Sequence, residues 1–357
     1  MIEVNVIDLF CGCGGISEGF KLAGFNIIAG IDLNEDALKT FAYNFPNSRA
    51  ICEDLLNFDD KRIQKEFGKD NIDVIVGGPP CQGFSNANRW QKEDADPRNK
   101  LFYEYLRFVK VLNPKMIVIE NVRGILTKDK GYAKDRIFNL ITKLGYKVSC
   151  KVLNASDYGV PQNRHRAFFI AVRNDISKNL FDFEKLNQLN KIDVKDAIGE
   201  LYILEKSKDE SHELSKNPDT KYRKYLRAKN NIITSHKIVY PALITQEKIK
   251  YVPQGGNWSD IPHELFKNNR NNRHSSAYKR LKESDQSVTI DTGNAHSNYF
   301  HPKFHRIPTV REAARIQSFK DNFIFLGTRS SQYKQIGNAV PPLLAKAIAS
   351  EIKKYLK

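Results

Sequence analysis

Short apolar runs alternate with amphipathic segments over the first 173 residues. Six runs are rich in β-branched residues and almost continuously apolar, which is typical of strands covered on both faces. We expect strands at 4–10, 26–33, 73–78, 116–122, 146–154 and 166–173. The segments between them carry apolar residues at helical spacing, at 16–23, 35–45, 101–112 and 133–144. This alternation predicts a doubly wound α/β sheet, which binds ligands at the carboxyl ends of its strands.

The pattern changes after about residue 174. The stretch 175–300 is polar, rich in Asn, Lys and Ser, and shows no clear period, so we expect an irregular second domain there. Helical spacing returns at 310–319, and 341–356 is expected to form one closing helix. We therefore predict one domain over 1–180, completed by 330–357, and a second, smaller domain with its hinge over 181–329.

Charge adds a first indication of function. The formal net charge is +16, and from Lys216 to Lys282 there are 15 Lys and Arg against 4 Asp and Glu. Such a surplus favours a polyanionic partner, because each neutralised phosphate releases counterions. The alternative is a solvated basic surface that keeps the protein soluble. No apolar run reaches the roughly 18 residues of a membrane span and no secretory signal is visible, so we expect a cytoplasmic protein.

The segment GGPPCQGFS, residues 77–85, directly follows an expected strand. Two glycines permit a tight turn and two prolines stiffen the chain beyond it, so Cys81 is presented at the carboxyl end of the strand. A thiolate is a strong nucleophile, and this setting makes Cys81 the candidate nucleophile. By contrast, Cys52 and Cys150 are expected to be small buried hydrophobic residues.

A glycine-rich turn lies in DLFCGCGGISEGF, residues 8–20, between an expected strand and helix. Such a turn brings backbone close to a ligand, although many α/β proteins use one only to reverse direction. Two acids at later strand ends, Asp32 and Asp54, strengthen the functional interpretation, because an acid about 20 residues downstream commonly binds a ribose hydroxyl. Cys11 and Cys13 lack a matching second pair and make a poor zinc site, so we expect no metal.

Two further segments carry candidate polar groups. Glu120 lies in IENV near the end of an expected strand, where its carboxyl would face the same sheet edge as Cys81. In PQNRHR, residues 161–166, Gln162, Arg164 and Arg166 alternate and are expected to share one face of an extended segment. Two guanidinium groups there could hold phosphate or a polarised carbonyl. For either segment alone, a structural salt bridge is an equally good interpretation.

Taken in this order, the motifs resemble those of the cytosine-5 DNA methyltransferase family, and specifically its compact prokaryotic members. PTVREAARIQSF (308–319) and QIGNAVPP (335–342) also match in order and spacing. The resemblance covers most of 1–173 and about 302–350. It implies a Rossmann-like, S-adenosylmethionine-dependent methyltransferase domain with a smaller irregular DNA-recognition domain.

The resemblance implies S-adenosylmethionine as the cofactor. Asp32 would hold its ribose and Asp54 its adenine amino group, and Asn338 would close the pocket. The family more often has Glu at the first of these positions, so the shorter Asp32 puts its direct contact in doubt. The residues expected to line the cofactor pocket are Phe10, Gly12, Gly14, Asp32, Asp54, Pro80 and Asn338.

The resemblance also implies a catalytic set of Cys81, Glu120, Arg164 and Arg166. Cys81 would add to carbon 6 of a flipped-out cytosine, Glu120 would protonate ring nitrogen 3, and Arg166 would bond the carbonyl oxygen. Double-stranded DNA is the expected partner, with a cognate restriction endonuclease acting on the same site, and the protein is expected to be a monomer. The expected DNA contacts are Ser85, Arg98, Gln162, Arg270 and Arg273.

Two alternatives remain open. A tRNA cytosine methyltransferase would share this catalytic domain, but that branch typically carries a Cys-Phe-Thr tripeptide that is absent here. A catalytically silent DNA-binding protein would be expected to lack Cys81, Glu120 or Arg166, and all three are present.

Overall fold

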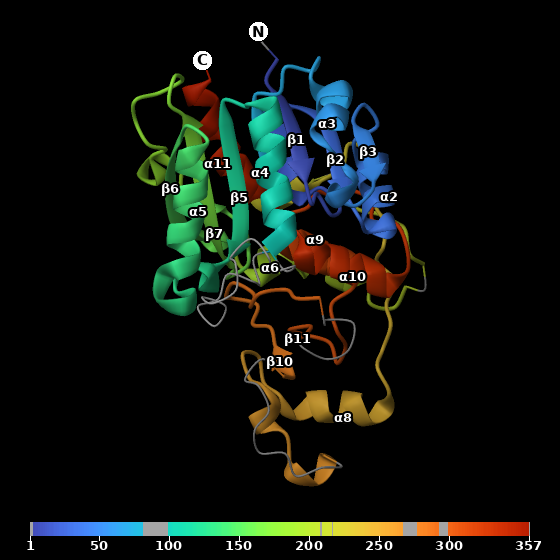
Figure 1. Ribbon diagram of the computed structural model, residues 1–357. Helices are drawn as coiled ribbons and strands as arrows, with labels where there is room; N and C mark the ends of the chain where they lie inside the picture. The colour runs from blue at the N-terminus through green and yellow to red at the C-terminus, as the bar shows by residue number, and fades with distance from the viewer. Residues whose placement is uncertain are drawn as a thin grey trace. The chain divides into compact units, whose positions relative to one another are not determined.

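The structure, a computed structural model, describes residues 3–80, 99–207, 209–215, 217–266, 277–292 and 299–356 (Figure 1). It divides into two compact units. The first comprises residues 1–154, 165–188 and 342–357, and the second comprises 155–164 and 189–341. These units differ from the predicted domains in three stretches: 155–164 and 330–341 fall in the second unit, and 181–188 falls in the first. The reason for the first difference is that residues 162–164 bond to residues 287–290, as when the Asn163 amide donates to the Ser287 carbonyl at 2.8 Å.

All six expected strands form, and their bounds shift by at most one residue at either end. The elements of the first unit are β1 (Asn5–Leu9), α1 (Gly15–Leu22), β2 (Asn26–Asp32), α2 (Glu35–Asn44), β3 (Arg49–Cys52), α3 (Asp60–Phe67), β4 (Val74–Gly77), α4 (Lys100–Leu112), β5 (Met116–Val122), α5 (Tyr132–Lys143), β6 (Tyr146–Asn154), β7 (His165–Arg173) and α11 (Pro342–Tyr355).

These strands form one seven-stranded sheet in the order β3-β2-β1-β4-β5-β7-β6. Neighbours are parallel except around β7, which is antiparallel to both β5 and β6. The sequence analysis missed β3, because this strand has four residues, none of them fully buried, and so lacks an apolar run. The order in which strands are added reverses between the parallel strands β1 and β4, since the chain proceeds from β1 outward to β2 and β3, and from β4 to the other half of the sheet.

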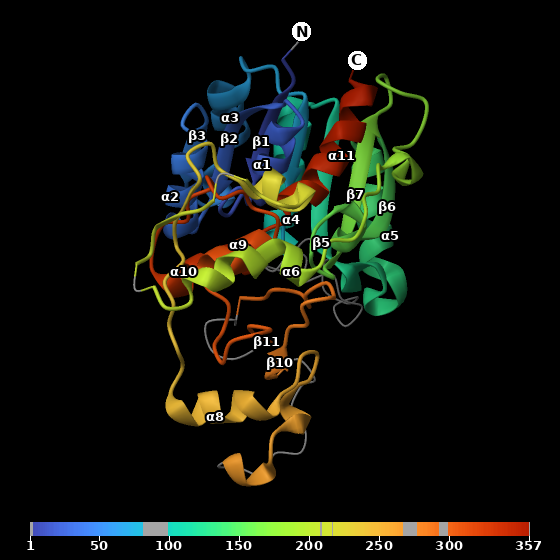
Figure 2. The same ribbon diagram turned by 180° about the vertical axis from the view of Figure 1, so that it is seen from behind.

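Helices cover both faces of the sheet. Helices α3, α4 and α5 lie on the face seen in Figure 1, and α1 and α11 lie on the face seen in Figure 2. The contact between α1 and α11 depends on Gly19, where an added Cβ would lie 2.4 Å from the Ala345 Cβ. The closing helix expected from the sequence therefore packs against the first helix. Local signals fix the helix starts: Asn34 caps α2 by accepting from the Ala37 amide, and Asp59 caps α3 in the same way.

The second unit is built from short elements, as its sequence predicts. They are α6 (Val194–Ile198), β8 (His212–Glu213), α7 (Lys221–Leu226), β9 (Ile232–Ile233), α8 (Leu243–Tyr251), β10 (Lys279–Arg280), β11 (Tyr299–Phe300), α9 (Val310–Ile316) and α10 (Arg329–Asn338). Around α9, buried ion pairs accompany buried apolar side chains such as Ile316 and Phe319. Fully buried Arg306 pairs with Glu312 at 2.7 Å, and fully buried Arg315 pairs with Asp321 at 2.7 Å. Thr309 and Glu312 form a capping box that starts α9.

Candidate active site and cofactor pocket

The candidate site lies at the carboxyl edge of the sheet in the first unit. Strands β2, β1, β4 and β5 are adjacent and parallel, so the residues that follow them emerge at one edge. The point at which the strand order reverses, between β1 and β4, lies at the centre of this edge. Doubly wound sheets bind ligands at such a position, because the loops there diverge to opposite faces.

The loop after β1 has an unusual backbone. Phe10, Gly12 and Gly14 all have positive φ, at 63°, 53° and 94°. At Gly14 an added Cβ would lie 2.5 Å from the Phe45 ring, so only glycine fits. At Gly12 an added Cβ would meet no atom within 4 Å, so open space adjoins the backbone there. The loop thus combines one packed glycine with one that leaves room for a ligand.

Two acids support this edge. The carboxylate of Asp32 accepts from the Gly12 amide at 2.8 Å and from the Asn34 amide at 2.8 Å. Asp54 accepts from the Leu56 amide at 3.0 Å and starts a short 3-10 turn. Asp32 therefore ties the end of β2 to the glycine loop, and each of its oxygens keeps a lone pair that can accept from a ligand hydroxyl.

Leu33 is a residue of this edge that the sequence analysis missed. Its side chain is 68% exposed directly after Asp32. An exposed apolar side chain beside a carboxylate can pack against a flat ring whose hydroxyl or amino groups bond to the acid. The signal was present in the sequence, as a leucine that follows the acid ending a strand. Together with the open space at Gly12, these residues fit an adenosyl group.

Glu120 and Arg166 form the central polar pair of the site. The Glu120 Oε1 lies 2.9 Å from the Arg166 Nε, and the two side chains are 15% and 17% exposed. They meet because β5 and β7 are antiparallel neighbours at this end of the sheet. On the other side, a Cβ added at Gly78 would lie 3.1 Å from the Glu120 Oε2. The carboxylate is thus held between the arginine and the backbone that follows β4.

The neighbouring Asn121 anchors the chain leading to Cys81. Its Nδ2 donates to the Pro79 carbonyl at 3.0 Å. Pro79 is buried and Pro80 is exposed, and Pro80 is the last described residue before 81–98. The predictions for Cys81, Ser85 and Arg98 fall outside the described residues, so they stay predictions.

The structure corrects the expectation that Gln162, Arg164 and Arg166 share one face. The Arg164 amide donates to the Gln162 carbonyl at 3.1 Å, so a tight turn precedes β7 and the alternation is lost. Arg164 is buried in the second unit, where its guanidinium donates to the carbonyls of Ile290 at 2.9 Å and Gly337 at 2.7 Å. These bonds give it a structural role there, whereas Arg166 is the partner of Glu120.

Gln162 is likewise built into the second unit. Its side chain is fully buried, accepts from the Ile290 amide at 2.9 Å and donates to the Gln317 side chain. Gln317 in turn donates to the carbonyls of Ile336 and Ala339. The predicted DNA contact of Gln162 is therefore corrected to an internal bond that fixes the end of α10. Asn338, the last residue of α10, is exposed within that unit.

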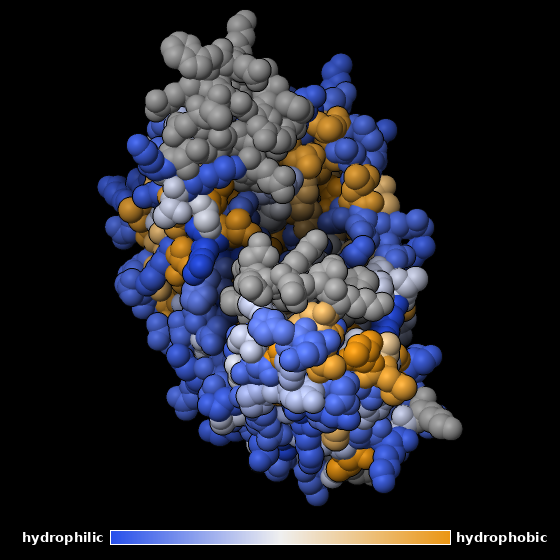
Figure 3. Space-filling view, turned by 90° about the horizontal axis from the view of Figure 1, so that it is seen from below, coloured by the Kyte–Doolittle hydropathy of each residue, from blue (hydrophilic) through white to orange (hydrophobic). Residues whose placement is uncertain are grey.

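The surface of the second unit carries an unusual helix. Helix α8 and the short segment before it expose large apolar side chains, with Leu243 82%, Ile244 52%, Tyr251 48% and Tyr240 45% accessible. Figure 3 shows that the surface seen from below is largely hydrophilic with separate apolar patches. The predicted base-reading residues Arg270 and Arg273 lie outside the described residues and stay predictions.

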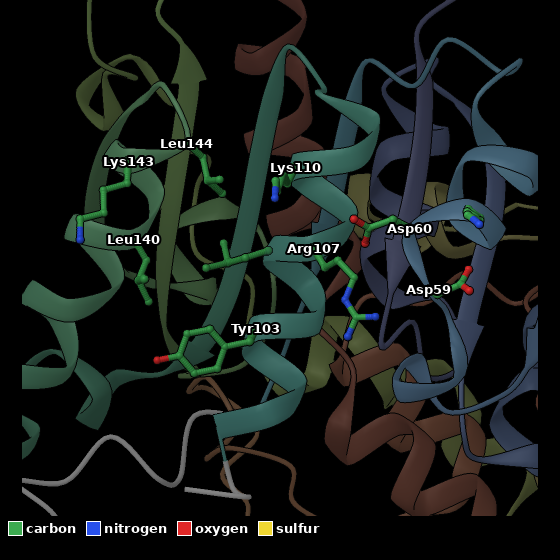
Figure 4. A pocket seen from close by; sticks show the side chains of 10 residues that line it. Asp59, Asp60, Tyr103, Arg107, Lys110, Leu140, Lys143 and Leu144 are labelled. Carbon is green, nitrogen blue, oxygen red and sulfur yellow. The ribbon is translucent and has the colours of Figure 1, made fainter. Parts of the chain in front are cut away.

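Other features do not add to the site. A surface cavity of about 720 Å³ lies on the face covered by α3, α4 and α5, and no predicted site residue lines it (Figure 4).

Cys52 is exposed, contrary to expectation, and Cys150 is half-buried. Among the described residues, no helix is long and apolar enough to span a bilayer. Within the same residues no group of three or more His, Cys, Asp or Glu could hold a metal ion.

Known proteins resemble the chain over its whole length. It is 38% identical to the type II methyltransferase M.DdeI of Desulfomicrobium norvegicum, covering 99% of this chain and 89% of that protein. It is 37% identical to the type II methyltransferase M1.HphI of Haemophilus parahaemolyticus, covering 99% and 87%. A prophage-encoded E. coli protein, assigned as a DNA modification methyltransferase, has a solved structure that matches with a TM-score of 0.81, 30% identity and 99% coverage of both chains.

The family comparison agrees with the geometry of the sheet edge. A model of the C-5 cytosine-specific DNA methylases matches residues 4–354, which include the glycine loop, the Glu120–Arg166 pair and the end of α10. A match across nearly the whole chain, together with relatives above 30% identity, leaves one conclusion: this protein is a member of the C-5 cytosine-specific DNA methylase family.

Proposed function

We propose that the protein methylates carbon 5 of a flipped-out cytosine in a specific DNA sequence, through a covalent bond to Cys81. The observation that carries this proposal is the Glu120–Arg166 pair, 2.9 Å apart, held against the backbone of Gly78 three residues before Cys81. An acid, a guanidinium and the backbone of Gly78, which precedes Cys81 in the chain, are thus gathered at one sheet edge. The type II methyltransferase names of the relatives support a role in a restriction-modification system, beside a cognate endonuclease.

The chemistry requires a nucleophile because carbon 5 of cytosine is too weak to attack a methyl sulfonium unaided. The Cys81 thiolate adds to carbon 6, and the electron pair of the 5,6 double bond is displaced into the ring. Glu120 delivers a proton to ring nitrogen 3, and Arg166 donates to the carbonyl oxygen, so the displaced charge is neutralised. After carbon 5 is methylated, a base takes the carbon 5 proton, the electron pair of that C–H bond re-forms the 5,6 double bond, and Cys81 leaves as the thiolate. The proton on ring nitrogen 3 returns to Glu120, and the aromatic ring is restored.

Arg166 has two tasks in this scheme. Its Nε is bonded to Glu120, which fixes the carboxylate, and the rest of the guanidinium fork presents further N–H donors. Because both side chains are only 15–17% exposed, the pair is partly desolvated and its interaction with a base is strengthened. Asn121 keeps the Pro79–Pro80 segment beside this pair through the Pro79 carbonyl.

The glycine loop and its two acids would hold S-adenosylmethionine, which supplies the electrophilic methyl group when bound. Asp32 would accept from the ribose hydroxyls, Asp54 from the adenine amino group, and Leu33 would pack against the adenine ring. Phe10, Gly12, Gly14 and Pro80 would line the pocket, and Asn338 would close it. The open space beside Gly12 and the 68% exposure of Leu33 support this assignment.

The second unit would read the DNA sequence. Its segment from Lys216 to Lys282 is strongly basic, and α8 presents both apolar and cationic side chains. A helix fits the major groove, where apolar side chains contact the thymine methyl group. Buried Arg280 donates to the carbonyls of Val252 at 2.9 Å and Pro302 at 3.1 Å, which braces the end of α8. The helix can therefore approach DNA as a rigid element.

The test is to express the full chain in a methylation-deficient bacterium and to bisulfite-sequence a resident plasmid. Protected cytosines that share one short sequence, and that disappear with Cys81→Ser and Glu120→Gln, are the expected result. Ser350→Ala, an exposed change on α11, should leave the pattern intact and serves as the matched control. If the folded protein protects no cytosine, the proposal fails, and tritium transfer to tRNA becomes the next assay.

A further inference from the structure

Asp8 is a buried carboxyl that the mechanism above does not use. It lies in β1, two residues before Phe10, and is fully buried. Its Oδ2 accepts from the Ser17 hydroxyl at 2.6 Å, and Ser17, the third residue of α1, is also fully buried. The Asp8 Oδ1 has no hydrogen-bond partner among the described residues. A carboxyl group thus connects the strand before the glycine loop to the helix after it.

Two carboxylates therefore hold the glycine loop, at different points. Asp32 accepts from the Gly12 amide in the middle of the loop, and Asp8 accepts from Ser17 just beyond its end. Gly14 occupies the N-cap position of α1 and supplies no capping side chain. Asp8 consequently ties the first turn of α1 to the neighbouring strand through the Ser17 hydroxyl.

The surroundings of Asp8 contain other acidic groups. Asp32 on β2, Cys11 and Cys13 in the loop, and Tyr105 on α4 all interact with it electrostatically. The pKa of Asp8 is raised to about 7, mainly by burial; the Ser17 bonds oppose this rise and the charge of Asp32 adds to it. Burial also raises the pKa values of Cys11, Cys13 and Tyr105, so these three stay neutral near pH 7.

We propose that Asp8 is a positioning residue for the cofactor, which holds the Phe10–Gly14 loop through Ser17 and couples cofactor binding to loss of its own proton. The inference rests on the proposed function, because it takes this loop as the S-adenosylmethionine site. The cofactor carries a sulfonium and an ammonium cation, and nearby positive charge favours an ionised carboxyl. Binding should therefore release a proton and tighten as pH rises through neutrality.

The experiment is isothermal titration of the full chain with S-adenosylmethionine at about pH 6 and about pH 8.5, in two buffers of different ionisation enthalpy. The wild-type Kd should fall about tenfold at the higher pH, with net proton release. S-adenosylhomocysteine lacks the sulfonium charge and should show a smaller dependence. Asp8→Asn keeps the shape of the side chain and its bond to Ser17, and should lose both the pH dependence and the proton release.

Two further variants separate positioning from simple stability. Ser17→Ala removes the bond to Asp8 and should weaken binding at both pH values, whereas Ser350→Ala should match the wild type. If Asp8→Asn only lowers the melting temperature and keeps the wild-type pH dependence, the inference is overturned. The inference is also overturned if the affinity of the wild type for S-adenosylmethionine does not change with pH.

Failure of the proposed S-adenosylmethionine site would give a different experimental result. If the folded wild-type chain binds no S-adenosylmethionine at any pH, the proposed cofactor site fails, and the role of Asp8 fails with it. If the wild type binds and Asp32→Ala abolishes binding, the site stands, and the Asp8 variants alone decide the inference.

Discussion

The two arginines of PQNRHR are two residues apart in the chain, yet they belong to different units and have different partners. Arg166 lies at the sheet edge, is 17% exposed and pairs with the Glu120 carboxylate. Arg164 is buried in the second unit and donates to two backbone carbonyls. The first unit keeps partly exposed polar groups at its edge, whereas the second buries its polar groups in internal bonds. A motif arginine can thus serve chemistry or architecture, and its partners and burial distinguish the two roles.

The largest expected effect is on catalysis at the sheet edge. Glu120→Gln keeps the shape of the side chain but removes the proton donor, so kcat should fall by about 10²–10⁴-fold. Its melting temperature should stay close to that of the wild type, because the side chain is partly exposed. Tritium transfer from labelled cofactor to DNA measures the rate. A variant that keeps wild-type kcat would remove Glu120 from the mechanism.

The second-largest effect should appear in a direct contrast of the two arginines. Arg164→Ala should cost roughly 3–5 kcal/mol of unfolding free energy, because it leaves buried carbonyls without donors. Arg166→Ala should cost less unfolding free energy than Arg164→Ala, because Glu120 keeps some contact with solvent, while it should lower activity strongly. Urea unfolding and methyl transfer, measured on both variants, check the contrast. Equal losses of stability would show that the two units use their arginines alike.

Opposite pH dependences should distinguish the units, by up to roughly 3 kcal/mol for His236 and up to roughly 4 kcal/mol for Asp8. Burial lowers the pKa of His236, in the second unit, to about 4. The unfolded chain then binds the extra proton between pH 6.5 and 4, so the stability that neutral His236 provides is lost as pH falls through this window. The pKa of Asp8 is raised to about 7, so the stability that its protonated carboxyl provides is lost as pH rises from about 4 to 7.

Unfolding free energies measured from about pH 4 to 8 check these slopes. In the wild type, the free energy of unfolding should fall as pH drops from 6.5 to 4 because of His236, and His236→Asn should lose part of this fall. It should also fall as pH rises from about 4 to 7 because of Asp8, and Asp8→Asn should lose that fall. The stability change in each variant isolates one group. Parallel curves for wild type and variant would mean that the group is not linked to folding.

The smallest expected difference lies within the glycine loop. Gly14→Ala should destabilise by about 2–3 kcal/mol, because its Cβ would meet the Phe45 ring at φ 94°. Gly12→Ala should cost about 1 kcal/mol, since its φ is 53° and the Cβ has open space, but it should weaken cofactor binding. Thermal melts and cofactor titrations measure both. Unchanged binding in Gly12→Ala would place the cofactor elsewhere.

Local pattern predicted much of the first unit. Six strands, the alternation of helices and the sheet class follow from apolar runs and helical spacing, which depend on near neighbours in the chain. β3 was missed because it is short and only half-buried, and α3 because its eight residues are mostly polar. The stretch 175–300 lacked a readable period because its described elements are short, the longest helix being α8 with nine residues.

The sequence by itself determined the family, the class of sheet and the candidate groups Cys81, Glu120 and Arg166, because these are read from residue types at fixed spacings. Only the tertiary structure decided which polar residues are available to a ligand. Gln162 and Arg164 bond to Ile290, far along the chain, and Asp8 is enclosed between β1, α1 and β2. Burial and partner choice depend on such long-range contacts, and they determine whether a polar group reacts, binds or holds the fold together.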